Sequence, residues 1–389
     1  MSWTLFELRA GLKGVRSTDI PGKPRWAGAH RKLVVMSTPA DNEHFDVVVV
    51  GAGQAGLAVG YHLAKRGVRF VILDAGSRVG DSWRHRWDSL LLFTPARIDG
   101  LPEMPFPSSA RLLPTKDAMA DYLEAYAKRF KIPVRSGVVV DGLDRDDGYF
   151  LLKAGGLQIR ADQVVVTTGA NQVATVPPFA NELDPGILQL SAAQYRNPSD
   201  LKDGDVLVVG AGNSGTEIAI EAAKNHRTWL SGRSTGRASP AVFSRPVWWL
   251  ATNLMTRNTP MGRKLLSSAG GRGAPLLRIT PDEIAAAGIE RVGRIAGVEG
   301  RMPRAEDGRV LPVTTVVWCT GFRQDFGWIH LPVFDDQGHP LHVRGVVSDP
   351  GAGLYFAGLP FLHGVTSALV GGVGRDAEHV VDQVTKRAR

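Results

Sequence analysis

The alternation of hydrophobic and polar positions predicts a strand–turn–helix–strand unit near the start of the chain. Four consecutive valines, Val47–Val50, indicate a buried parallel strand. A glycine-rich turn follows at once, and residues 57–64 then show apolar positions at helical spacing. A second strand is predicted at residues 69–73 and ends on an acid, Asp74. This order is typical of a βαβ unit that binds a dinucleotide.

The turn between the first strand and the helix has the form Gly51-x-Gly53-x-x-Gly56. Gly51 is expected to make the tight turn, Gly53 to let a pyrophosphate approach the backbone, and Gly56 to let helix and strand pack closely. The helix N-terminus offers free N–H groups and a positive dipole end. Asp74 lies 18 residues after Gly56, near the place expected for an acid that holds a ribose hydroxyl.

A second copy of this pattern begins at Asp205. A strand of valine and leucine runs into Gly210-x-Gly212-x-x-Gly215, and a helical pattern follows. The same offset of 18 residues from the third glycine now reaches Arg233 instead of an acid. An acid would repel a 2′-phosphate and an arginine pairs with it, so the second copy is predicted to bind NADPH, with Arg237 as a second cation.

The fold class predicted from these patterns is α/β, with two Rossmann-like dinucleotide-binding domains, the second inserted in the first. The expected segments are a basic arm (1–40), an FAD-binding part (41–203), an NADPH-binding domain (204–315) and a second FAD-binding part (316–389). Shorter patterns predict a helix from the N-cap Thr115 to Arg129, a strand at Val138–Val140, a hairpin of 148–153 with 157–160, strands ending in Thr168-Gly169 and Thr320-Gly321, a capped helix at 279–288, a strand at 353–358, and a closing helix from Ala368 onward.

An apolar insertion at 240–273 interrupts the second domain. Its tryptophans and leucines, at 247–250 and 253–255, are surrounded by Arg245, Arg257, Arg263 and Lys264. The favoured interpretation is packing on the NADPH domain or on a partner subunit, which makes a homodimer possible. A lid or hydrophobic substrate entrance is the alternative, and contact with a membrane surface is a weaker one.

Composition narrows the class of protein. The formal charge is +8, of which +5 belongs to residues 1–40, so the body of the chain offers no basic face for nucleic acid. The arm is interpreted as disordered and dispensable, or as a segment preceding a natural start at Met36. The single cysteine, Cys319, excludes a disulfide framework, fits a cytoplasmic setting and is expected to serve in packing. No transmembrane segment is expected, and the ten histidines show no metal-ligand spacing.

Several motifs together resemble the flavin-containing monooxygenase-like family, over about Phe45 to Val384. They are the paired GAGxxG turns, GDSW at Gly80–Trp83, WCTGF at Trp318–Phe322, and the closing run GLYFAGLPFLHGVTSALVGGVGRDA. The resemblance is to a bacterial branch of predicted flavoproteins similar to plant indole-pyruvate monooxygenases. It implies FAD on the first domain, NADPH on the second, and a last helix that covers the flavin ring.

The resemblance also implies the residues of the two cofactor sites. The FAD site would comprise Gly51, Gly53, Gln54, Ala55, Gly56, Asp74, Ser82, Trp83, Thr94, Val140, Thr168, Gly169, Gly358 and Ser367. The NADPH site would comprise Gly210, Gly212, Asn213, Ser214, Gly215, Ser231, Arg233, Arg237, Thr320 and Gly321.

The activity implied is a monooxygenase that activates O2 as a C4a-(hydro)peroxyflavin and oxygenates a small organic substrate. The chain departs from the family at two candidate catalytic positions. Ser191 stands where the linker motif usually has histidine, and Thr94-Pro95 stand where animal enzymes place an asparagine beside the flavin. Release of peroxide, an NADPH:acceptor oxidoreductase or oxidase, and a non-catalytic flavoprotein therefore remain alternatives.

Overall fold

The computed structural model describes residues 43–268, 274–349 and 351–388. The predicted arm (1–40), the alternative start at Met36 and the last part of the apolar insertion (269–273) lie outside the described residues. Among the helices that are described, none combines the length and the apolar character needed to cross a membrane.

The first glycine turn belongs to a seven-stranded sheet in the order β3-β2-β1-β6-β5-β4, with β16 pairing with β6. Five of its strands are parallel neighbours, and the hairpin of β4 and β5 is antiparallel. The strands are β1 (Glu43–Val50), β2 (Phe70–Asp74), β3 (Val134–Ser136), β4 (Val140–Asp146), β5 (Tyr149–Ala154), β6 (Leu157–Val166) and β16 (Leu354–Phe356). The valines of β1 are buried, as the continuous apolar run predicts.

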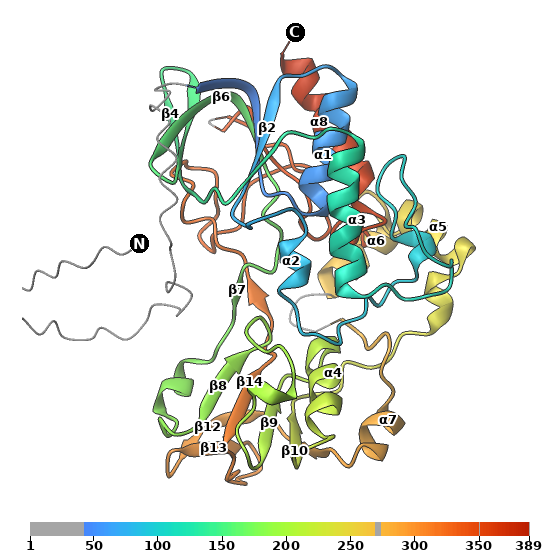
Figure 1. Cartoon of the computed structure of the whole chain (residues 1–389), viewed down its shortest axis with the longest axis vertical. Helices are drawn as coiled ribbons and strands as arrows, with labels where there is room; N and C mark the ends of the chain where they lie inside the picture. Colours follow the sequence, from blue (N-terminus) through green and yellow to red (C-terminus); the bar gives the residue numbers. More distant parts are fainter. Residues whose placement is uncertain (1–42, 269–273, 350, 389) are drawn as a thin grey trace, which may run out of the picture. The chain divides into compact units, whose positions relative to one another are not determined.

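Three helices pack together beside this sheet: α1 (Gln54–Lys65), α3 (Lys116–Arg129) and α8 (Val373–Arg387) (Figure 1). Close packing of α1 depends on Gly60, where an added methyl carbon would lie 2.8 Å from the Ile132 side chain. The hydroxyl of Thr115 accepts a hydrogen bond from the Ala118 amide, which confirms the predicted N-cap of α3.

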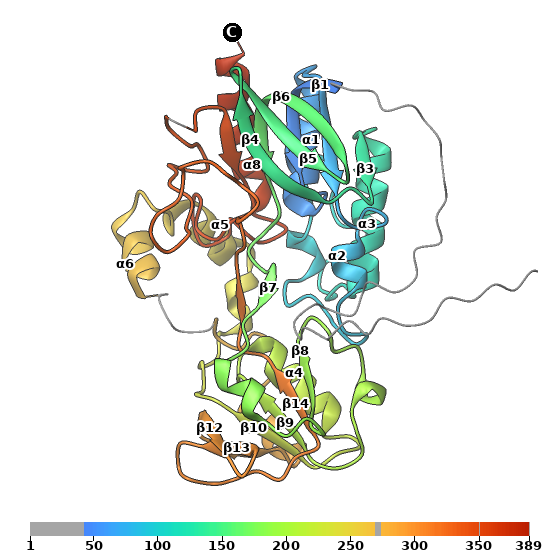
Figure 2. The ribbon, with the colours of Figure 1, turned by 90° about the vertical axis from the view of Figure 1, so that its left-hand side faces the viewer.

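The second glycine turn belongs to a separate five-stranded parallel sheet in the order β11-β10-β9-β14-β8 (Figure 2). Its strands are β8 (Leu188–Ser191), β9 (Val206–Val209), β10 (Thr228–Ser231), β11 (Glu290–Val292) and β14 (Thr315–Trp318), with α4 (Asn213–Ala222) after β9 and α7 (Pro281–Ala286) before β11. Because β16 and α8 return to the first sheet, the predicted α/β fold with an inserted second unit is confirmed.

The second sheet draws strands from outside the segment expected for it. β8 precedes residue 204, and most of β14 follows residue 315, so by sheet membership the inserted unit runs from β8 to β14. Two short strands, β7 (Val173–Ala174) and β15 (Phe322–Arg323), pair antiparallel where the chain enters and leaves this unit. A small hairpin, β12 (Ile295–Glu299) and β13 (Met302–Ala305), precedes β14.

Three expectations about local structure are wrong. No strand covers Val138–Val140, because β3 ends at Ser136 and β4 begins only at Val140. The hairpin predicted for 148–153 with 157–160 is confirmed by the antiparallel pairing of β5 with β6, but the strand predicted before Thr168 is not a separate one: it is the last part of β6, which pairs with β16. The closing helix begins at Val373, because Gly371 and Gly372 are held against the carbonyl oxygens of Ile98 and Thr366.

The apolar insertion forms two helices, α5 (Arg245–Leu254) and α6 (Pro260–Ser268). Its main chain hydrogen-bonds to the closing segment: the Arg257 amide donates to His363 O at 2.9 Å, and the Val365 amide donates to Met255 O at 3.2 Å (Figure 2). The Arg375 guanidinium donates to Thr252 O at 2.7 Å. These bonds join the insertion to segments expected to bind FAD, which corrects the favoured expectation of packing on the NADPH domain.

The remaining short elements are the 3-10 turns η1 (Ala96–Ile98), η2 (Pro178–Glu182), η3 (Pro198–Asp200) and η4 (Pro240–Phe243), and the one-turn helix α2 (Asp81–Arg84).

Candidate dinucleotide-binding sites

The first glycine turn is shaped by two of its three glycines. Gly51 has φ +107°, and a methyl carbon there would lie 2.9 Å from Thr167 O. A methyl carbon on Gly56 would lie only 1.9 Å from Gly51 O. Both positions therefore need glycine for the protein's own packing.

Gly53 is different from its two neighbours. Its φ of −73° suits any residue, and a methyl carbon added there would meet no atom within 4 Å. Nothing in the protein requires glycine at this position, and the space beside it is open. A pyrophosphate approaching the N-terminus of α1 would account for both facts.

Asp74 lies against this turn. Its carboxylate accepts hydrogen bonds from the Ala52 amide at 2.6 Å and from the Gly76 amide at 2.8 Å. Each oxygen keeps a further lone pair that could accept a ribose hydroxyl. Asp74, at the end of β2, therefore lies beside the glycine turn as the sequence pattern predicts. Its contact with a ribose stays a prediction.

The second turn repeats the first. Gly210 has φ +113°, and its methyl carbon would lie 2.2 Å from Cys319 O, while that of Gly215 would lie 1.7 Å from Gly210 O. Gly212 has φ −81° and open space beside it, like Gly53. The Asn213 side chain donates a hydrogen bond to Pro275 O and accepts one from the Leu277 amide. It therefore holds the loop at residues 275–277 against the second turn.

The end of β10 carries the cations expected to meet a 2′-phosphate. Arg233 and Arg237 are exposed, and in the described part of the chain no hydrogen bond or ion pair engages the guanidinium of Arg233. A third arginine, Arg291, lies alongside and donates to Gly232 O at 2.8 Å. The hydroxyl of Ser231, by contrast, is buried and donates to Gly293 O at 2.8 Å.

The two Thr-Gly pairs lie at the connection between the sheets. Their strands, β6 and β14, end two residues before them. The Thr168 hydroxyl accepts a hydrogen bond from Gln172 at 2.9 Å, and the Thr320 hydroxyl donates to Thr175 O. The Thr175 amide donates to Gly321 O at 2.9 Å, so the second pair closes the crossing made by β7 and β15.

Some of the other predicted FAD residues are brought together. A methyl carbon on Gly358 would lie 2.6 Å from the Ala55 side chain, which places the end of β16 against the start of α1. The Ser367 hydroxyl accepts from the His363 and Gly364 amides. Ser82 and Trp83 lie in α2, and Val140 begins β4.

The two candidate catalytic hydroxyls have protein partners. Thr94 is buried and donates to Asp99 Oδ1 at 2.6 Å, and Ser191 at the end of β8 donates to Gln194 Oε1 at 2.9 Å. Within the described residues, no hydrogen bond joins Thr94 to Ser191. Asp99 was not identified as a candidate residue from the sequence, because an aspartate in a loop carries no special pattern. Its burial raises the pKa of the carboxyl to about 7.

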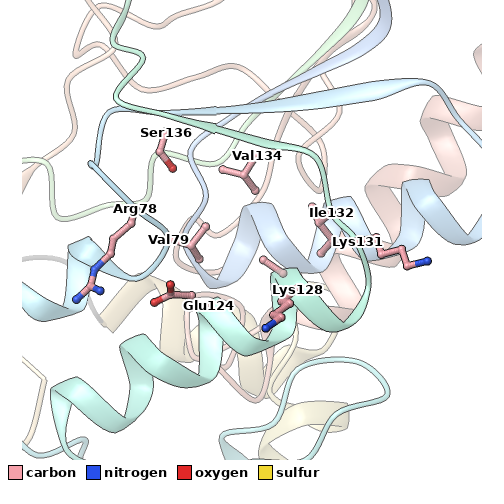
Figure 3. A pocket seen from close by; sticks show the side chains of 9 residues that line it. Arg78, Val79, Glu124, Lys128, Lys131, Ile132, Val134 and Ser136 are labelled. Atoms are coloured by element: carbon pink, nitrogen blue, oxygen red, sulfur yellow. The ribbon is translucent and has the colours of Figure 1, made fainter. Parts of the chain in front are cut away.

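The cavity drawn in Figure 3 has a volume of about 470 Å³ and lies between α3 and β3. Arg78, Glu124, Lys128 and Ser136 are among its lining residues. None of the predicted cofactor residues lines it, so the glycine turns and not this groove define the candidate site.

The described residues define a class of protein with two dinucleotide-binding units built on the same strand–turn–helix plan. Over residues 48–358 the chain matches the family described as pyridine nucleotide-disulphide oxidoreductase, and it belongs to that family. With one cysteine, it cannot form an internal dithiol pair.

Named relatives narrow this assignment. The chain is 38% identical over 342 residues to the uncharacterized oxidoreductase CzcO-like of Geobacillus kaustophilus, covering 87% of this chain and 98% of that protein. It is 29% identical over 312 residues to indole-3-pyruvate monooxygenase YUCCA1 of Oryza sativa subsp. japonica, covering 72% and 77% of the two chains. The flavin-containing monooxygenase from Stenotrophomonas maltophilia superposes with a TM-score of 0.73 at 27% identity, covering 89% of this chain and 100% of that one. The chain is thus a CzcO-like oxidoreductase related to YUCCA and bacterial flavin monooxygenases.

Proposed function

We propose that this oxidoreductase is an FAD- and NADPH-dependent monooxygenase acting on a small organic substrate. The observation that carries the proposal is the matched pair of turns, each with one glycine that the protein does not itself need. Gly53 and Gly212 leave open space at helix N-termini, where a dinucleotide pyrophosphate fits. The names of the related monooxygenases support the reaction type.

The charges at the two strand ends divide the cofactors between the turns. Asp74 would hold the ribose of FAD, and a carboxylate there would repel a 2′-phosphate. Arg233 and Arg237 would hold the 2′-phosphate of NADPH. When bound, these cofactors supply hydride transfer and oxygen activation, and the protein supplies position and shielding from water.

The hydrogen bonds of Thr94 and Ser191 favour a second candidate function, an NADPH oxidase that releases hydrogen peroxide. The Thr94 hydroxyl is directed at Asp99 and that of Ser191 at Gln194, so neither donates to a ligand in this arrangement. Thr94 stands in place of the asparagine of similar enzymes, and Ser191 in place of the histidine. These two replacements favour release of the activated oxygen as peroxide over its transfer to a substrate.

The test is the fate of oxygen in FAD-loaded protein supplied with NADPH. For a candidate substrate such as an aromatic 2-oxo acid, NADPH consumption, hydrogen peroxide and the incorporation of ¹⁸O from ¹⁸O2 are measured together. A monooxygenase transfers labelled oxygen to product. Quantitative peroxide with every substrate supports the oxidase, and FAD that NADPH cannot reduce without oxygen contradicts both.

A further inference from the structure

Two arginines close together in sequence, Arg84 and Arg86, have opposite surroundings. The Arg84 guanidinium lies 2.9 Å from Asp121, 2.7 Å from Glu124 and 3.5 Å from Asp81. It is therefore a structural arginine, which joins α2 to α3 through the carboxylates of Asp121 and Glu124.

Arg86 has no such partners. Its guanidinium lies over the ring of Phe322, 5.8 Å from the ring centre, and in the described ranges no hydrogen bond or ion pair joins it to another group. The side chain is only partly exposed, and burial lowers its pKa, with a smaller contribution from the charge of Arg196. A cation removed from water without an opposite charge is strongly unfavourable, and one aromatic face compensates it only in part.

The charge that acts most closely on Arg86 is positive and comes from Arg196. Arg196 is half-buried, and its guanidinium donates to the carbonyl oxygens of Ala193 and Tyr195. The nearby carboxylates are directed elsewhere: Asp88 accepts from the Asn197 side chain, and Asp200 accepts from the Arg196 amide. Among the described residues, no carboxylate is therefore bonded to the guanidinium of Arg86 or of Arg196.

The place of this pair in the fold suggests what supplies the counter-charge. Arg86 follows Trp83 on the segment expected to approach the flavin, and Phe322 follows Thr320-Gly321 on the segment expected to approach NADPH. We infer that Arg86, backed by Phe322 and Arg196, is a binding site for a ligand anion, a carboxylate or a phosphate group. A carboxylate would come from the substrate, and a phosphate from the nicotinamide dinucleotide. The inference rests on the proposed function only for this choice of source.

The first experiment is thermal unfolding of the full chain loaded with FAD, at constant ionic strength, for wild type, Arg86→Met and the matched control Arg84→Met. Removing an uncompensated charge should raise the midpoint of Arg86→Met in buffer without added anion, whereas Arg84→Met should lower it. Added phenylpyruvate or inorganic pyrophosphate should raise the midpoint of wild type by more than that of Arg86→Met, in which pyrophosphate can still bind at the Gly212 turn. A fall in the Arg86→Met midpoint like that of Arg84→Met, or an undiminished response to both anions, would overturn the inference.

The second experiment identifies the source of the anion by titrating NADP⁺ and phenylpyruvate separately. If the anion belongs to the nucleotide, Arg86→Met weakens NADP⁺ binding about tenfold or more and leaves phenylpyruvate binding unchanged. If it belongs to the substrate, the reverse holds. Equal binding of both ligands to wild type and variant contradicts the site. Failure of NADPH to reduce the flavin would refute the proposed function without altering the unfolding result.

Discussion

The two glycine turns have the same backbone and different support. In the first, the Thr167 hydroxyl lies 2.9 Å from Val50 O and 2.7 Å from Gly51 O, so a hydrogen bond holds strand and turn together. In the second, Cys319 takes the corresponding place: a methyl carbon added to Gly210 or Gly215 would lie 3.3 or 3.2 Å from the Cys319 Cβ. Burial raises the pKa of the Cys319 thiol to about 12, which suits packing and not nucleophilic chemistry.

In both turns, some glycines are required by the packing of the protein itself, and others would be required only by a bound ligand. The first and third glycines of both turns are fixed by contacts within 3 Å, whatever the ligand. The middle glycines, Gly53 and Gly212, face open space. The charged residue at or after the end of the second strand differs between the copies, Asp74 in the first and Arg233 in the second, and can suit a different cofactor in each. Variants at matched positions of the two turns should therefore give effects of different kinds.

The largest effect is expected where a side chain has no room. Gly215→Ala places a methyl carbon 1.7 Å from Gly210 O, and Gly56→Ala places one 1.9 Å from Gly51 O. Each should cost roughly 3 kcal/mol or more of unfolding free energy, because the backbone must shift. Urea unfolding of the two variants checks this. Stability within 1 kcal/mol of wild type would mean that the turns can open easily.

The next effect concerns the ligand alone. Gly53→Val should fold, since its backbone angles and surroundings accept a side chain, but its FAD affinity should fall by about tenfold or more. Circular dichroism and flavin fluorescence after dialysis separate the two properties. Gly212→Val is the matched control and should retain FAD while losing NADPH. A yellow Gly53→Val protein with full FAD content would refute the pyrophosphate assignment.

A third variant addresses the charges at the strand ends. Arg233→Ala/Arg237→Ala removes the two exposed cations, and a charged hydrogen bond contributes roughly 1.5–3 kcal/mol. NADPH binding should therefore weaken by about 10- to 150-fold, and NADH binding should hardly change. The rate of anaerobic flavin reduction against nucleotide concentration measures both. If the preference for NADPH keeps its original factor, the phosphate is held elsewhere, and Arg291 is the next residue to test.

The smallest effect concerns the two supporting side chains. Thr167→Cys makes the first turn resemble the second and removes the hydroxyl bond, which should cost about 1 kcal/mol of stability. Cys319→Ser gives the second turn a hydroxyl and is the reciprocal variant. Chemical denaturation curves report both. A loss of unfolding free energy well above 2 kcal/mol for Thr167→Cys would show that the Thr167 hydrogen bond stabilises the first turn more than expected.

The sequence predicted those parts of the fold that local pattern controls. The valine run of β1, the glycine turns and the Thr115 cap each depend on residues a few positions apart, and all are found as expected. The strand predicted at Val138–Val140 failed because strand propensity does not specify where pairing begins: Val140 pairs with Ala154 as the first residue of β4, and Val138 lies before that strand.

Features made by distant segments could not be predicted in this way. Asp99 appears in the sequence as a loop acid, and only its burial beside Thr94 distinguishes it. Arg86 differs from Arg84 only in what other segments bring to it, Phe322 in one case and Asp121 with Glu124 in the other. The docking of the insertion on His363 likewise depends on main-chain bonds that carry no sequence signal.

The pairing of β7 with β15 has a consequence for how such a protein can change over evolutionary time. The chain departs from the first sheet through Ala174 and returns through Phe322, and these residues are register partners. The segment between them is joined covalently to the rest at two adjacent points, and its apolar insertion also hydrogen-bonds to the closing segment through Met255 and Arg257. A gene rearrangement could therefore exchange this segment by a single pair of cuts, provided that the new segment again meets the closing run at His363 and Val365.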